Sequence, residues 1–150
     1  MSNIEQVGEQ EFLELLQELE ETKHLFGENS LDYATCLNRV ATYHLKQGKP
    51  DEAEILVRQV PNIIKRLLSE NSQEFAKSMA NLAMVLEKQG KLEEAEPLRR
   101  KVVSIHRNLS GVMSPEFANG LKCLADLYKK QGKPDEEREI RNMIPNFDIF

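Results

Sequence analysis

The sequence feature that most constrains the fold is a four-residue motif, Lys-Gln-Gly-Lys, that occurs at residues 46–49, 88–91 and 130–133. Successive copies lie 42 residues apart, and no insertion or deletion interrupts the spacing. Small and apolar residues recur in the same register: Ala34, Ala76 and Ala118; Ala41, Ala83 and Ala125; and Leu37, Met79 and Leu121. A fixed period of this length predicts a repeat protein, in which each unit buries its apolar face by stacking on its neighbours.

The composition is that of an ordinary soluble domain, with 150 residues, 40% hydrophobic and 30% charged. A chain of this length can bury a sizeable core in one domain. It has no run of about 18 apolar residues and no basic region followed by an apolar one at its start, so we expect neither a membrane span nor a secretory signal. Cys36 and Cys123 form no CxxC motif, and we expect reduced thiols in a cytoplasmic protein.

Charge is unevenly spread along the chain. Residues 1–28 carry eight glutamates against Lys23 alone, a net charge of −7, whereas the whole chain carries −5. The remaining residues are therefore slightly basic. Any acidic surface should lie in the N-terminal segment, and any basic surface in the repeats.

A leading helix is predicted before the first complete repeat. Residues 1–10 lack helical periodicity, and we expect them to be frayed. From Glu11 to about Phe26 one face is apolar, formed by Phe12, Leu15, Leu16, Leu19 and the aliphatic part of Lys23. Leu25-Phe26 matches Leu67-Leu68 one period later, so this helix is interpreted as the second half of an incomplete leading repeat that caps the stack.

Each complete repeat is predicted to be a pair of helices. The expected N-caps of the first helices are the pairs Asn29-Ser30 and Asn71-Ser72 and, with Pro115 in the first turn, Ser114. The glycine of the motif is expected to end each of these helices. Pro61 should bend or break the second helix of the first repeat. We predict one domain over residues 1–150, with the acidic segment and cap helix at 1–28, repeats at 29–70 and 71–112, and a third repeat with the C-terminal cap at 113–150.

Helical phase predicts which side chains are buried. In the first helices these are Ala34, Leu37, Val40, Ala41, His44, Ala76, Met79, Leu82, Ala83, Leu86, Ala118, Leu121, Leu124, Ala125 and Tyr128. In the second helices they are Ala53, Leu56, Val60, Ile63, Ile64, Leu67, Leu98, Val102 and Ile105. Glu137 stands where Ala53 and Ala95 stand, which suits a polar terminal cap. The apolar tail 147–150 is expected either to fold back on that cap or to form a contact site.

These residues resemble a tetratricopeptide repeat (TPR). The likeness rests on the recurring motif glycines, the small residues Ala41, Ala83 and Ala125, and Ala53 and Ala95 early in the second helix. The 42-residue period and the stretches 79–83 and 88–98 resemble the kinesin-light-chain type in particular. The resemblance covers about residues 29–150 and implies an all-α, right-handed α-α superhelix.

For function, the resemblance implies a scaffold or adaptor that binds peptides or proteins. In kinesin-light-chain-like repeats an asparagine recurs at the groove positions held here by Arg39, Asn81 and Cys123, and only Asn81 matches. The carboxylate clamp of chaperone-binding repeats is likewise matched convincingly only at Asn81. The resemblance therefore predicts a partial set of peptide-binding residues.

The first helix of each pair is expected to line a concave groove. Among the exposed positions of these helices, basic residues outnumber the acidic ones, Glu87 and Asp126, by seven to two. The predicted peptide-binding groove comprises Asn38, Arg39, Lys46, Lys77, Asn81, Met84, Lys88, Asn119, Lys122, Asp126, Lys129 and Lys130. The matching partner is an acidic protein or peptide, held by charge-assisted bonds and by carboxamides that bind its backbone. The alternative that these lysines only form a solvated face stays open.

A second hypothesis starts from the uneven charge. The acidic N-terminal segment would contact the basic groove, in its own chain or in another copy, and give an autoinhibited module or a self-associating scaffold. The competing interpretation is that residues 11–26 dock as the leading cap and expose their acids to water.

Catalysis is not expected. His24, His44 and His106 lie in three different elements, and His44 takes a core position held by Leu86 and Tyr128 in the other repeats. Paired carboxylates stand at helix starts, where the helix dipole accounts for them. No phosphate loop, GxSxG motif or metal-ligand cluster is present, so no catalytic residue, cofactor or metal is predicted. A pI near 5.3 and the lack of groove aromatics argue against nucleic acid as a partner.

Overall fold

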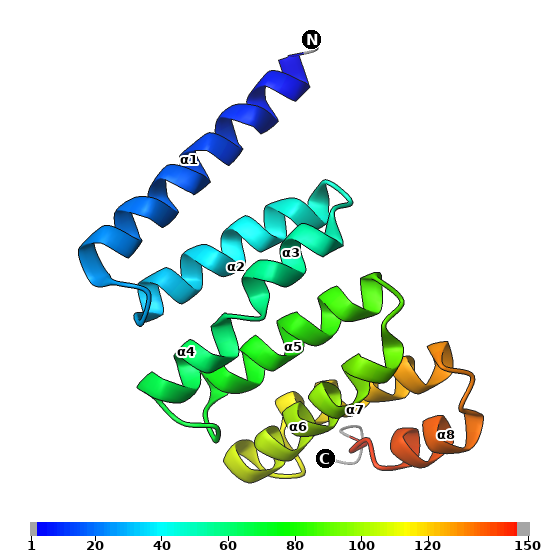
Figure 1. Ribbon diagram of the computed structural model, residues 1–150. Helices are drawn as coiled ribbons and strands as arrows, with labels where there is room; N and C mark the ends of the chain where they lie inside the picture. The colour runs from blue at the N-terminus through cyan, green and yellow to red at the C-terminus, as the bar shows by residue number, and fades with distance from the viewer. Residues whose placement is uncertain (1–2, 147–150) are drawn as a thin grey trace. The chain divides into compact units, whose positions relative to one another are not determined.

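The computed structural model describes residues 3–146, and the side chains of residues 8–146. Every regular element in this part of the chain is a helix, which confirms the predicted all-α class. In chain order the helices are α1 (Asn3–Phe26), α2 (Leu31–Lys46), α3 (Pro50–Val57), α4 (Val60–Leu67), α5 (Gln73–Lys88), α6 (Leu92–Ser110), α7 (Pro115–Lys130) and α8 (Pro134–Asn142) (Figure 1).

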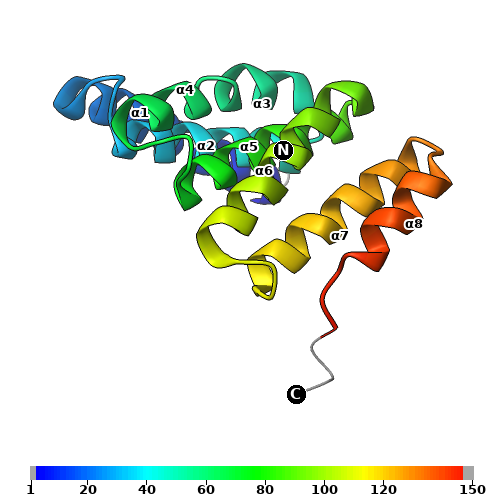
Figure 2. The same cartoon turned by 90° about the horizontal axis from the view of Figure 1, so that it is seen from below.

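The chain divides into two compact units, Met1–Ser69 and Glu70–Phe150. In the first unit α2 is the central helix, since α1, α3 and α4 all pack against it. In the second unit α6 packs against both α5 and α7, and α7 packs against α8, as Figure 2 shows. The boundary between the units falls at the predicted end of the first repeat. That all repeats form one domain stays a prediction.

The Lys-Gln-Gly-Lys motif ends every first helix in the same way. Gly48, Gly90 and Gly132 have φ values of 69°, 75° and 68°, in the left-handed region that glycine enters without a steric penalty. The N–H of the lysine that follows donates at 2.9 Å to a carbonyl five residues back; the acceptors are His44, Leu86 and Tyr128. The motif therefore closes one helix and turns the chain into the next.

Serine caps start the first helices, as predicted. The hydroxyls of Ser30, Ser72 and Ser114 each accept a hydrogen bond at 3.1 Å from the N–H three residues later. The residues that donate are aromatic and buried: Tyr33, Phe75 and Phe117. Cap and ring thus form one local unit that fixes where each first helix begins and anchors it to the core.

Pro61 interrupts the second helix of the first repeat, as predicted. Because proline has no N–H to donate and its ring collides with the preceding turn, the segment divides into α3 and α4, joined at residues 58–59. Val103 holds the same register position one repeat later, and α6 runs unbroken from Leu92 to Ser110.

The prediction that residues 1–10 are frayed is wrong for residues 3–10, because α1 already begins at Asn3. This first part of α1 is rich in glutamate and glutamine, which have good helix propensity although they show no apolar stripe. The helix also gains an anchor there, since the Tyr43 hydroxyl donates at 2.9 Å to the carbonyl of Gly8. Periodicity detects burial, and residues 8–10 are helical although none of them is fully buried.

Three predicted burial positions are also wrong. Lys23 is exposed and pairs with Glu28 at 2.6 Å, and the neighbouring Thr22 is buried instead, 3.5 Å from the Cys36 thiol. Leu16 is exposed on α1, and Leu67 is exposed because α4 ends at this residue. The half-buried positions are Phe12, Leu15, His44, Leu56, Met79 and Leu98, and the other predicted core positions are buried.

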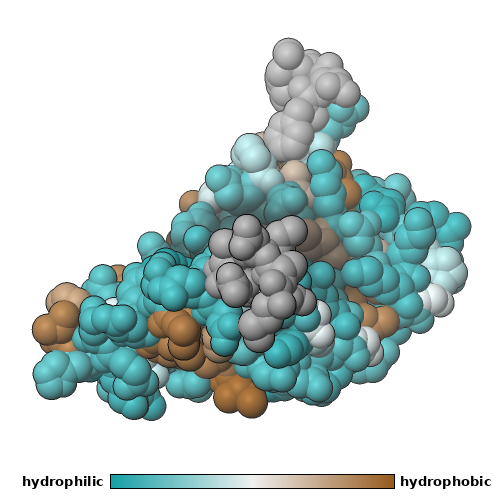
Figure 3. All heavy atoms as spheres, turned by 90° about the horizontal axis from the view of Figure 1, so that it is seen from above, coloured by the Kyte–Doolittle hydropathy of each residue, from teal (hydrophilic) through white to brown (hydrophobic). Residues whose placement is uncertain are grey.

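Hydrophilic side chains predominate on the face shown in Figure 3, with hydrophobic ones in separate patches. The most exposed large apolar side chains are Leu25 at 70% and Ile55 at 68%. None of the helices in the described part of the chain has the length and apolar character needed to cross a bilayer. The expected fold of residues 147–150 lies outside the described residues.

Candidate peptide-binding surface

The first helices of the three repeats are α2, α5 and α7, and they carry all the residues of the predicted groove. In the first unit Arg39 and Lys46 are exposed on α2 and Asn38 is half-buried. In the second unit Asn81 is half-buried, and the exposed residues are Lys77, Met84, Lys88, Asn119, Lys122, Asp126, Lys129 and Lys130. Each set lies within its own unit, and a groove that joins them stays a prediction.

Three of these charges have ionic partners. Arg39 pairs with Glu18 of α1, and Asp126 pairs with Arg141 of α8 at 2.8 Å. Lys130 lies 3.3 Å from Glu87.

Glu87 itself also accepts a hydrogen bond at 2.7 Å from Arg99 of α6. Sequence reasoning placed Glu87 on the groove side, but only about a tenth of its side chain is exposed. It therefore acts as a structural link between α5, α6 and α7.

Five lysines of the first helices make no ion pair within residues 8–146. They are Lys46, Lys77, Lys88, Lys122 and Lys129. On the second helices, by contrast, most cations pair with carboxylates: Arg99, Arg100, Lys101, Arg138 and Arg141. The exceptions include Arg107, which makes no ion pair within residues 8–146, and Arg66, which donates a hydrogen bond to Asn29. The positive charge that a partner could use is thus concentrated on the first helices.

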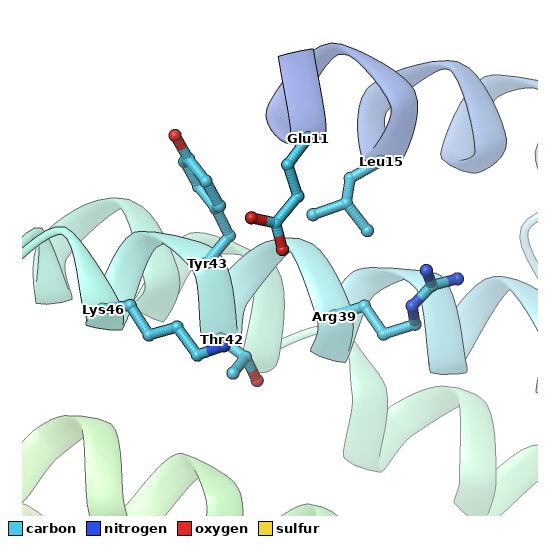
Figure 4. Close-up of a pocket in the computed structure, with 6 residues that line it drawn as sticks. All are labelled: Glu11, Leu15, Arg39, Thr42, Tyr43 and Lys46. Carbon is cyan, nitrogen blue, oxygen red and sulfur yellow. The ribbon is translucent and has the colours of Figure 1, made fainter. Parts of the chain in front are cut away.

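A shallow pocket of about 210 Å³ lies between α1 and α2 in the first unit. Glu11 and Leu15 line it from α1, and Arg39, Thr42, Tyr43 and Lys46 line it from α2 (Figure 4). Sequence reasoning found Arg39 and Lys46 but not the contribution of α1. The sequence could have indicated this contribution. Glu11 occupies the repeat position that is held in the next two repeats by Ala53 and Ala95, which are fully buried.

The Phe12 ring fixes α1 on α2 beside this pocket. It stacks on Tyr43, with 4.7 Å between ring centroids and 15° between planes, and meets His44 edge-on at 5.3 Å. His44 is therefore a packing residue, as predicted. Its equivalent Tyr128 is also held by the preceding second helix, but through a hydrogen bond, because its hydroxyl donates at 3.2 Å to Glu96 of α6.

Glu96 is a strongly perturbed carboxyl in the second unit. Hydrogen bonds from Lys133, at 2.9 Å, and from Gln131, Arg100 and Tyr128 lower its pKa to about 2, against the opposing effect of burial. Together these donors hold the end of α7 and the loop after it on α6. The cluster is structural, because both carboxylate oxygens accept hydrogen bonds from the protein itself.

His106 is half-buried on α6, and burial lowers its pKa, with a smaller opposing effect from Glu116. Its Nδ1 and that of His44 are buried without a hydrogen-bond partner within the described residues. No group of three histidine, cysteine or acidic side chains in residues 8–146 is arranged to hold a metal ion.

Paired helices on a 42-residue period, with glycine turns between them and cationic first helices, define an α-helical repeat protein of the protein-interaction class. The tetratricopeptide-repeat family model matches residues 34–74 and 75–116, more than half of the chain. The chain therefore belongs to the tetratricopeptide-repeat family, whose members are typically non-catalytic.

Solved structures show the same fold. The nearly identical TPR-like repeats assigned to a kinesin light chain of Podosopora anserina superpose with a TM-score of 0.83 at 20% identity, covering 91% of this chain and 65% of that one. BtubC (BKLC) from P. vanneervenii gives 0.77 at 21% identity, covering 93% and 60%. The TPR domain of Arabidopsis FLU gives 0.63 at 18% identity, covering 74% and 90%.

The chain spans less than two thirds of the length of the kinesin-light-chain-type structures that it resembles. No curated protein matches the sequence. The predicted kinesin-light-chain-like repeat type is confirmed by the family model and by these structures.

Proposed function

We propose that this chain is a non-catalytic interaction module that binds an acidic peptide segment on the first helices of its repeats. The observation that carries the proposal is a contrast between helices. Among the described residues, the lysines and arginines of the second helices α6 and α8 pair with carboxylates, with the exception of Arg107, whereas Lys77, Lys88, Lys122 and Lys129 on the first helices α5 and α7 have no anionic partner. Unpaired cations attract acidic segments over a distance of about a Debye length.

Carboxamides on the same helices would bind the backbone of the peptide. Asn81 is half-buried on α5 and Asn119 is exposed on α7, and each can donate and accept a hydrogen bond. Met84, which lies about one turn after Asn81 on α5 and is 38% exposed, adds an adaptable apolar contact. An acidic peptide in extended or helical form would use charge for attraction and these groups for position.

The test uses fluorescence anisotropy with a fluorescein-labelled peptide of alternating glutamate and serine. Replacing Lys77 and Lys122 by methionine should weaken binding about tenfold, since each lost charge-assisted contact costs on the order of 0.5–1 kcal/mol at an exposed site. Lys101→Met combined with Arg107→Met is the matched control, because it also removes two positive charges, here from the second helix α6. Equal losses in both variants would mean that only net charge matters, and that no site exists on the first helices.

A second candidate function is self-association or autoinhibition through the acidic N-terminal segment. The ion pair between Glu18 of α1 and Arg39 of α2 favours it, because a carboxylate of that segment already engages one residue of the proposed groove. Within one chain this contact accompanies the docking of α1 as a cap. Sedimentation velocity over a range of concentrations tests self-association: reversible dimers support it, and a strict monomer contradicts it. Deleting residues 1–28 tests autoinhibition, because the deletion should then strengthen peptide binding.

A cytoplasmic location is part of the proposal. Cys36 and Cys123 are free thiols, the first buried and the second half-buried. Free cysteines are usual where the compartment is reducing. The partner is accordingly proposed to be a protein of that compartment, with no role for nucleic acid or membrane.

A further inference from the structure

The pocket between α1 and α2 is a second feature of the molecule that could hold part of a ligand. Its volume of about 210 Å³ is below the range of about 300–1,000 Å³ that is usual for small-molecule sites. It suits a single side chain. Because both walls belong to the first unit, the pocket is defined without reference to the second unit.

Within residues 8–146, the pocket presents one unpaired cation and one unpaired anion. In Figure 4 the Glu11 carboxylate extends from α1 towards α2 between Tyr43 and Leu15, and the Lys46 side chain runs along α2 towards Thr42. Neither charged group has a hydrogen bond or ion pair in this part of the chain. The other polar groups are engaged, since Arg39 pairs with Glu18 and the Thr42 hydroxyl donates at 2.8 Å to the carbonyl of Asn38.

The register explains why an acid can stand in this place. In the complete repeats the positions equivalent to Glu11 and Glu18 are alanine and valine, buried against the first helix of the same repeat: Ala53, Val60, Ala95 and Val102. Among the described residues α1 has no first helix of its own. Its glutamates therefore remain accessible beside α2, which carries the proposed peptide-binding residues.

We propose that this α1–α2 pocket receives one glutamate of an acidic peptide. The side-chain carboxylate of that glutamate accepts a hydrogen bond from Lys46, and its backbone N–H donates to Glu11. Leu15 and the Tyr43 ring contact its methylene groups, which favours glutamate over the shorter aspartate. An inorganic anion could bind Lys46 but has no N–H to donate to Glu11, so a peptide is the ligand that satisfies both walls.

This inference rests on the proposed function and adds a defined anchor to it. The first unit would contribute a pocket for one residue of the peptide. α1 then has two roles, as a helix that packs on α2 and as one wall of the anchor pocket.

The test uses the full chain and the labelled glutamate–serine peptide. Lys46→Met removes the cation, and Thr42→Phe fills the pocket with a ring. Each should weaken binding by about three- to tenfold. The matched controls are Lys49→Met, which removes the same charge three residues away, and Thr35→Phe, which places the same ring two turns earlier on α2 at an exposed threonine with the same hydroxyl bond to the backbone.

Two further measurements make the outcome decisive. Glu11→Ala should weaken binding if this carboxylate accepts the peptide N–H; stronger binding would overturn that contact. A peptide with aspartate in place of glutamate should bind less tightly than the glutamate peptide.

If Lys46→Met and Thr42→Phe bind the peptide as tightly as the parent protein does, while the variant at Lys77 and Lys122 binds it more weakly, the proposed role of the pocket is wrong. The proposed function then still holds. Parent affinity in all of these variants would remove the proposed function itself. Thermal unfolding of each variant, followed by circular dichroism, checks that the fold is retained.

Discussion

Gly120 of α7 lies directly against His106 of α6, so that a Cβ on Gly120 would come within 3.7 Å of the imidazole Cδ2. It would also come within 3.3 Å of Val103 Cγ2. Two repeats earlier, the positions equivalent to Gly120 and His106 are Cys36 and Thr22, which touch at 3.5 Å. The large His106 is thus matched by glycine on the next first helix, and the smaller Thr22 is matched by the larger Cys36. Size complementarity at this pair sets how closely successive helices pack.

Gly120→Leu should therefore destabilise the protein by about 2–3 kcal/mol, because an overpacked helix contact must push α6 and α7 apart. Gly120→Ala should have a smaller effect, since the gain in helix propensity of about 1 kcal/mol offsets part of the crowding. The exposed neighbour provides the control, and Asn119→Leu should stay within about 0.5 kcal/mol of the parent. Urea unfolding measures all three; an unchanged midpoint for Gly120→Leu would contradict the close packing.

The lowered pKa of Glu96 predicts that the free energy of unfolding decreases at acidic pH. Because its folded pKa of about 2 lies below the ordinary value of 4.5, the unfolded chain binds its proton first as pH falls. The stabilisation is complete above about pH 4.5 and is lost between there and pH 2. Glu96→Gln should cost about 1–2 kcal/mol at pH 7, discounted because Lys133 and Arg100 are partly in water.

The measurement is the difference in unfolding free energy between parent and Glu96→Gln across that pH range. It should shrink as the pH approaches 2. Glu93→Gln, at a side chain that is 80% exposed, is the control and should show little difference at any pH. A constant difference for Glu96→Gln would show that its carboxylate is not held by the donors around it.

Docking of α1 should depend on Phe12. Removing its ring, which stacks on Tyr43 and meets His44 edge-on, should destabilise the first unit by about 2 kcal/mol, less than for a fully buried phenylalanine. Leu13→Ala is the matched control, because Leu13 is the next residue and is 54% exposed. Hydrogen exchange of α1 amides should rise in Phe12→Ala only; equal exchange in both variants would mean that the ring does not hold α1.

The motif glycines should each resist substitution. Gly90 has a φ of 75°, and nothing lies within 4 Å of the position that a Cβ would take on it, so Gly90→Ala tests backbone strain without crowding. It should cost about 1 kcal/mol, the cost of placing a non-glycine residue in the left-handed region. Gly8→Ala is the control. Because Gly8 lies within helix α1, this substitution should be neutral or stabilising. A thermal melt of each variant suffices, and equal shifts would contradict the turn geometry.

Much of the fold follows from the period, because turn and cap chemistry are local. Ser72 and Gly90 act on neighbours within five residues, so their roles can be predicted from the sequence. The link from Glu87 to Arg99 and the cluster around Glu96 could not be predicted in this way, because they join residues that only tertiary packing brings together. The early start of α1 could not be predicted because residues 3–10 have no apolar periodicity in the sequence.

The candidate site was predictable to a similar degree. Helical phase correctly placed Lys77 and Lys122 on exposed positions. Helical phase could not show that Glu18 pairs with Arg39, because it does not tell which residues of α1 lie opposite which residues of α2. The contribution of Glu11 to a pocket depends on the same docking.

The most direct test of the proposed function is the salt dependence of peptide binding. The affinity of the labelled glutamate–serine peptide would be measured from about 50 mM to about 500 mM sodium chloride, with a glutamine–serine peptide alongside. Unpaired lysines on the first helices predict an affinity that falls steeply with salt for the glutamate peptide, and little binding of the glutamine peptide at any salt. Equal affinity for both peptides, unchanged by salt, would contradict recognition of an acidic partner.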